Sequence, residues 1–132
     1  MGSEKIKMIK KYALCFAIGA AGYGSIEMIW RGWTHWSMMI AGGLCFIAFS
    51  VVAERFYHRS ILFRAGVCAV CVTAIEFVFG VIFNLILGMA VWNYSHMPLN
   101  ILGQVCPLFS LMWGGIAILF LPLAEAINAE FG

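Results

Sequence analysis

The sequence predicts an all-α polytopic membrane protein, a bundle of four transmembrane helices. Of its 132 residues, 64% are hydrophobic and only 11% are charged, whereas soluble domains carry about 25% charged residues. Four apolar stretches are each long enough to cross a bilayer, which takes about 17–25 residues. We therefore expect residues 1–132 to form a single transmembrane domain, with the lipid bilayer as its solvent.

The expected helices cover residues 12–30, 36–53, 61–88 and 101–123. The third is the longest. At about 1.5 Å per residue it exceeds a hydrocarbon core of about 30 Å, so it must tilt, kink or extend into one interface. The stretches between these helices are too short to hold a soluble catalytic domain.

The basic residues predict the orientation of the bundle. Placing the N-terminus in the cytoplasm leaves only Arg31 among the eight Lys and Arg residues outside, in agreement with the positive-inside rule. The seven on the inner side are Lys5, Lys7, Lys10, Lys11, Arg55, Arg59 and Arg64. We expect both termini inside (N-in/C-in), with 31–35 and 89–100 outside.

The cysteines and histidines do not suggest a cofactor or metal site. Cys68 and Cys71 form a C-x-x-C pair, but redox chemistry requires an accessible thiolate, and both lie within an apolar helix. We interpret them as small packing residues. The three histidines fall in three different loops, at positions 35, 58 and 96. We predict no cofactor, no metal and no nucleic-acid partner.

Two acidic residues fall at membrane depth, where charged groups are costly and usually face a cavity or a partner. Glu27 precedes Arg31 by four residues, so the two share a helix face. They form either an interfacial ion pair or part of an outward-facing cavity. Glu76 lies on a stripe of four-residue steps that continues through Gly80 and Asn84. This stripe indicates either a close packing face or a polar, proton-linked pocket.

The stretch WNYSHMPLN at 92–100 is polar although it lies between two apolar runs. Trp92 is expected first as an interfacial anchor and second as a substrate contact. Asn100 is expected to cap the fourth helix. Gln104 follows one turn later on the same face, where it serves no capping role. The polar pattern therefore extends from the loop into the expected fourth helix.

These residues carry a family resemblance. The run Trp92-Asn93-Tyr94-Ser95, then Pro98, Asn100 and Gly103, then Ser110-x-x-Trp113-Gly114, resembles the signature of the small bacterial membrane proteins described as putative ABC-transporter type IV (CmpB-like). The glutamate of the first helix and the E…G…N pattern of the third are also similar. The chain departs from the signature at Asn93, where the family usually has Asp.

The resemblance implies a transport-related protein of the bacterial inner membrane, but it supplies no substrate. The sequence has no G-x-x-x-x-G-K-S/T phosphate loop, so any ATP hydrolysis is expected from a separate ATPase subunit. Four helices are few for a complete permease, which favours a homo-oligomer.

The sequence thus favours a transport-related protein with a polar pocket for a small-molecule substrate in the outer half of the bundle. The alternatives are a small multidrug-type proton-coupled antiporter and a non-catalytic accessory subunit of a transporter. A membrane enzyme acting on lipid, quinone or thiols is less favoured, and no catalytic residue is predicted. The expected substrate-binding residues are Glu27, Glu76, Asn84, Trp92, Asn93, Tyr94, Asn100 and Gln104.

Overall fold

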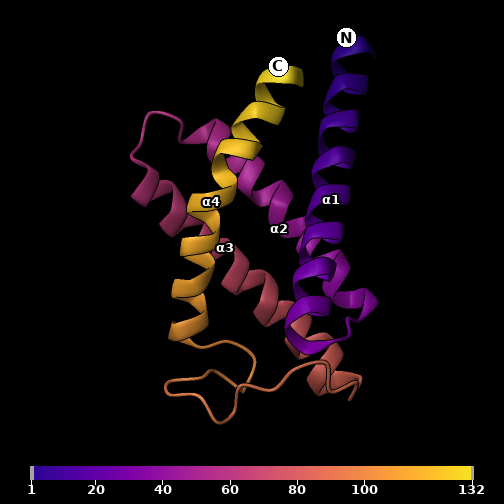
Figure 1. Ribbon diagram of the computed structural model, residues 1–132, viewed down its shortest axis with the longest axis vertical. Helices are drawn as coiled ribbons and strands as arrows, with labels where there is room; N and C mark the ends of the chain where they lie inside the picture. The colour runs from indigo at the N-terminus through magenta and orange to yellow at the C-terminus, as the bar shows by residue number, and fades with distance from the viewer. Residues whose placement is uncertain (1, 132) are drawn as a thin grey trace.

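The computed structural model describes residues 2–131 and is all-helical over that range. Helix α1 covers Gly2–Arg31 and α2 covers Trp36–Arg55. Helix α3 covers Ile61–Phe79 and continues directly as the π-helix η1, Gly80–Ile86, before α4 at Pro107–Phe131 (Figure 1). All four spans are long and apolar enough to cross a membrane. The predicted four-helix membrane fold is therefore confirmed.

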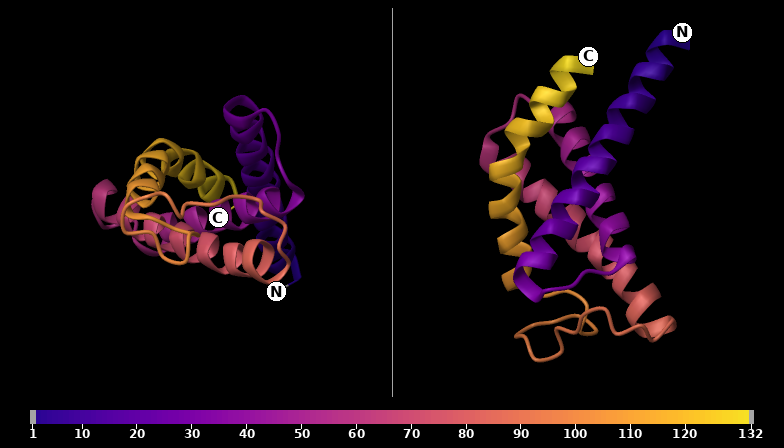
Figure 2. Two further views of the ribbon diagram at one scale, coloured as in Figure 1. Left: turned by 90° about the horizontal axis from the view of Figure 1, so that it is seen from below. Right: turned by 45° about the vertical axis from the view of Figure 1, so that its right-hand side comes forward.

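The connections divide between the two ends of the bundle. Both termini and the turn after α2 lie at one end, which we call the termini end (Figure 1). The 32–35 connection and the long non-helical segment 87–106 lie at the other, which we call the loop end (Figure 2). This is the grouping that the charge distribution predicts. Which end faces the cytoplasm stays a prediction.

Helix α2 is the most buried of the four and packs against each of the others. Its Phe46 and Phe49 join Cys15 of α1, Val72 of α3 and Leu121 of α4 in the main core. The outer faces of the other helices expose large apolar side chains, as expected where lipid is the solvent. The core is thus arranged around α2.

Glycines let α1 and α2 approach closely. A Cβ added at Gly19 would collide with the carbonyl oxygen of Gly42, and one added at Gly42 would collide with Tyr23. At Gly43, an added Cβ would lie 2.6 Å from the Phe16 ring. Small residues are what permit such backbone contact between helices in a membrane.

At the loop end, the end of the third helix and the start of the fourth differ from the prediction. Regular α3 ends at Phe79 and the wider π-helix carries the chain only to Ile86, rather than a single helix reaching residue 88. The fourth helix begins at Pro107, not at 101, because Leu102 and Gly103 adopt left-handed backbone conformations with φ of 54° and 72°. Proline is well suited to a first helical position, since it has no N–H to leave unpaired.

Helices α1 and α4 extend beyond their predicted limits at the termini end. Helix α1 already begins at Gly2, and α4 continues to Phe131. The apolar stretches mark only the part of each helix suited to lipid, whereas the helical backbone continues into more polar residues at the termini end.

The α1–α2 contact gives a stability prediction. Gly19→Ala should lower the thermal unfolding temperature of the detergent-solubilised protein, because overpacking a tight contact costs about 1–3 kcal/mol. Gly115→Ala is the matched control, since no atom lies within 4 Å of the added Cβ there. Fluorescence-detected size-exclusion after heating measures both; equal melting of the two variants would show that the contact is not tight.

Candidate functional site

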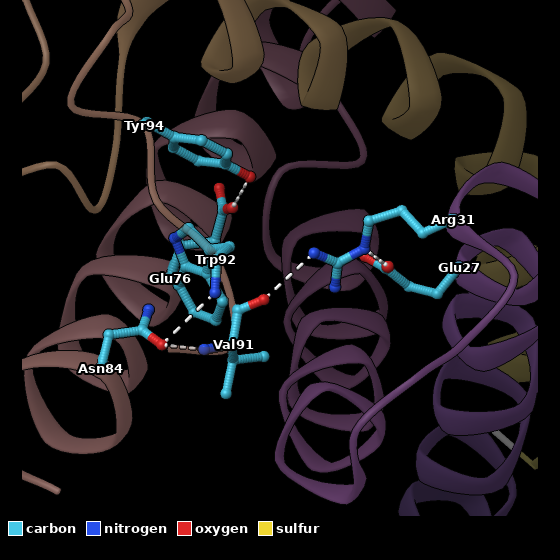
Figure 3. A network of polar contacts seen from close by, with 7 residues as sticks. All are labelled: Glu27, Arg31, Glu76, Asn84, Val91, Trp92 and Tyr94. Carbon is cyan, nitrogen blue, oxygen red and sulfur yellow. Dashed lines mark hydrogen bonds and ion pairs between the residues drawn. The ribbon is translucent and has the colours of Figure 1, made fainter. Parts of the chain in front are cut away.

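The polar side chains that the sequence singles out gather at the loop end, where 87–106 folds against the helices (Figure 3). They divide into residues that hydrogen-bond this segment to the bundle or to itself and residues that line a cavity beneath it.

Asn84 of η1 is the main attachment point. Its Oδ1 accepts hydrogen bonds from the backbone N–H groups of Val91 (2.6 Å) and Trp92 (3.3 Å), and its Nδ2 donates to Gln104 Oε1 at 2.8 Å. The Trp92 indole donates to the Gln104 carbonyl at 2.9 Å. Buried backbone groups need such partners, so Asn84 and Gln104 together hold both ends of the segment.

Gln104 lies against the backbone of Gly80, the first residue of η1. A Cβ at Gly80 would lie 2.9 Å from the Gln104 Cβ and 2.5 Å from its Oε1. The glycine in the E…G…N stripe therefore makes room for the amide side chain that Asn84 binds.

Asn93 and Asn100 stabilise turns within the segment itself. Asn93 Oδ1 accepts from the Ser95 N–H at 2.8 Å, a local bond that an aspartate in the same place would also make. Asn100 donates to the Met97 carbonyl at 2.8 Å and accepts from the Gly103 N–H at 2.9 Å. The expectation that Asn100 caps the fourth helix is wrong, because the chain turns at 101–105 before α4 begins.

Glu27 and Arg31 form the predicted ion pair on α1, with Arg31 Nε 2.5 Å from Glu27 Oε2. The same guanidinium donates to the Val91 carbonyl at 3.0 Å and lies over the Trp33 ring at 4.4 Å from its centroid. Arg31 therefore links the end of α1 to the segment, while Glu27 compensates its charge.

Glu76 of α3 is buried, with 6% of its surface exposed. The Tyr94 hydroxyl donates to Glu76 Oε2 across 3.5 Å (Figure 3). Burial raises the pKa of the Tyr94 phenol, and the carboxylates of Glu76 and Glu27 raise it further. The phenol therefore stays protonated at neutral pH and remains a hydrogen-bond donor.

A cavity of about 270 Å³ lies between α1, α2, α4 and the segment; we call it the outer cavity. Of the eight predicted site residues, Glu27, Trp92 and Tyr94 line it, and Glu76 reaches it through Tyr94. Asn84, Asn93, Asn100 and Gln104 are engaged in the segment's own hydrogen bonds and do not line it. The remaining lining residues are Tyr23, Ile26, Arg31, Met38, Phe109, Met112, Trp113 and Ile116.

Sequence reasoning missed most of this apolar and aromatic wall. Helical spacing carried a signal for it: Tyr23 precedes Glu27 by one turn, and Phe109, Trp113 and Ile116 repeat on one face of α4. The rings also pair, Tyr23 with Trp113 and Tyr94 with Phe109, with centroids 5.4 Å and 4.6 Å apart.

A second cavity, of about 160 Å³, continues between α1, α2 and α4; we call it the inner cavity. It shares Tyr23, Ile26, Trp113 and Ile116 with the outer cavity and extends along Gly22. The two cavities are therefore neighbours, and these four residues border both.

The C-x-x-C pair lies away from both cavities. Cys68 is fully buried in the main core, and Cys71 is partly buried and packs against it. Neither thiol lines the outer or the inner cavity, so their position fits the packing role expected from the sequence.

A family model described as "Putative ABC-transporter type IV" matches residues 14–131. The chain belongs to this family. The match takes in all the residues of the outer cavity, so this ABC-transporter-related family includes both the bundle and the segment that covers it. Comparison with curated proteins and with solved structures gives no match.

The attachment of the segment gives a second prediction. Asn84→Ala should speed hydrogen exchange at the Val91 and Trp92 amides, because losing the acceptor of a buried N–H costs about 1–3 kcal/mol. Asn128→Ala is the control, since Asn128 makes a comparable pair of hydrogen bonds, to Ser50 at the termini end. If hydrogen exchange at residues 91–92 is unchanged in Asn84→Ala, Asn84 is not the residue that attaches the segment to the bundle.

Proposed function

We propose that this chain is the membrane-embedded component of an ABC-type transport system and binds a small-molecule substrate in the outer cavity. The observation that supports this most is the composition of the cavity wall, which combines residues of three transmembrane helices with the non-helical segment. A ligand there contacts the segment and the helices at once, so its binding can favour one arrangement of the helices over another, as a transport cycle requires. Membership of the ABC-transporter-related family points the same way.

The partners follow from what the sequence contains. Since the 132 residues include no phosphate-binding loop, we assign ATP hydrolysis to a separate ATPase subunit. Four spans favour assembly with further copies of the chain. The excess of basic residues supports an orientation with the termini end in the cytoplasm, and we assign the chain to a bacterial inner membrane. An ATPase would then dock at the termini end.

A proton-coupled antiporter of the small multidrug type is the second candidate. It is favoured by Glu76, an acid buried at membrane depth that accepts a hydrogen bond from the neutral Tyr94 hydroxyl. Such a carboxyl can exchange a proton with a substrate. The two candidates differ in their energy source.

Obstructing the cavity tests the proposal. Ile116 lines both cavities, so Ile116→Trp should fill the space and abolish substrate-dependent function. Leu119→Trp is the matched control on the same helix, because Leu119 is 74% exposed and lines neither cavity. We expect a P-loop ATPase to co-purify with the tagged chain from native membranes. In proteoliposomes, its ATP hydrolysis should fall several-fold with Ile116→Trp and stay unchanged with Leu119→Trp.

Other outcomes would redirect the assignment. A purified chain that moves substrate in response to a pH gradient alone, without an ATPase, would favour the antiporter. The chain and the ATPase could also form a complex whose ATP hydrolysis responds to neither tryptophan variant. That result would leave only the role of an accessory subunit.

A further inference from the structure

We propose that the outer cavity takes an organic cation, with its ammonium head against the aromatic wall and an apolar substituent directed into the inner cavity. This inference rests on the proposed function and specifies the substrate class of the same site. It is carried by the cavity's aromatic rings, its charges and its shape.

Five aromatic rings line the outer cavity and come from three separate parts of the chain. They are Tyr23, Trp92, Tyr94, Phe109 and Trp113. The faces of such rings attract alkylammonium groups, and several rings around one space form the kind of cage that binds quaternary ammonium ions. Tyrosine and tryptophan predominate here, and tryptophan is the strongest partner for a cation.

The charges at the cavity also favour a cation. Glu27 lines it directly and Glu76 lies behind the Tyr94 hydroxyl, whereas Arg31 is the one basic side chain among the lining residues. Arg31 pairs with Glu27 through Nε and donates to the Val91 carbonyl through Nη1, whereas its buried Nη2 has no hydrogen-bond partner among the described residues. The two acidic side chains at or behind the wall outnumber the one guanidinium, which is already paired with Glu27, so the balance of charge at the cavity favours a cation.

The inner cavity is the reason for proposing that the cation carries an apolar substituent. The inner cavity shares Tyr23 and Trp113 with the outer one and extends from them toward Phe46 and Phe49. Gly22 borders this space, and a Cβ added there would meet no atom within 4 Å. An alkyl chain on the cation would therefore find apolar walls and gain binding energy in proportion to the area it buries.

The head-group chemistry is tested with three probes of nearly equal shape: choline, the neutral 3,3-dimethylbutan-1-ol and the anionic 3,3-dimethylbutanoate. Titration calorimetry on the full chain in lipid nanodiscs compares their affinities. We expect choline to bind about tenfold more tightly than the neutral alcohol, because only its ammonium group is attracted to the aromatic rings and to a carboxylate. The anion should bind least tightly of the three. Glu76→Gln should reduce this preference several-fold, whereas Glu54→Gln, at the termini end, should not.

The apolar extension is tested with tetramethylammonium and hexyltrimethylammonium. The hexyl compound should bind more tightly to the wild-type chain, and Gly22→Leu should remove that advantage while leaving tetramethylammonium binding unchanged. Gly66→Leu is the control, since an added Cβ there also meets no atom within 4 Å and Gly66 lines neither cavity.

The outcomes separate this inference from the proposed function. If the alcohol or the carboxylate binds as tightly as choline and Ile116→Trp abolishes that binding, the cation assignment is overturned and the cavity remains a substrate site. If choline binds and Ile116→Trp has no effect on it, both are overturned. If none of the probes binds, the cation assignment fails, and the response of ATP hydrolysis to Ile116→Trp decides the proposed function independently.

Discussion

The hydrogen bonds that Asn84 makes to Val91 and Trp92 are the interactions on which the loop end depends. Segment 87–106 is non-helical and packs against apolar helices, so its backbone groups have few partners of their own. It also includes Leu99 and Leu102 in the left-handed region, with φ of 58° and 54°. Such conformations persist only where surrounding contacts hold them. The amides of Asn84, Asn100 and Gln104 provide such contacts, together with backbone hydrogen bonds such as that from the Tyr94 N–H to the Gly103 carbonyl.

Fixing the segment also builds the cavity. Trp92 and Tyr94 follow directly after the backbone groups that Asn84 holds, and their rings become one wall of the outer cavity. Arg31 attaches the same stretch to α1, and Tyr94 attaches it to α3 through Glu76. The acidic residues and the rings thus meet at one site because three helices hold the same short stretch of chain.

Hydropathy and charge alone predict the four spans and the grouping of their ends, since both depend on summed composition. They do not predict where α3 changes to η1 or where α4 begins, because those boundaries depend on how Gly80 packs against Gln104 and on left-handed residues that are not all glycine. The polar residues of the loop end could also be selected from sequence. Their separate roles could not, since an amide that binds backbone and one that faces a ligand look alike in sequence. The aromatic wall was missed because aromatic residues in an apolar helix are equally typical of lipid contact.

The distance across the loop end tests most directly whether the segment is held in place. Genetically encoded spin labels at Ile29 and Leu99, both strongly exposed, report the separation of α1 from the segment in lipid nanodiscs by pulsed electron resonance. A fixed segment predicts one narrow distance distribution, which broadens when Asn84 is replaced by Ala. A distribution that is already broad in the otherwise wild-type chain would contradict the structure described above.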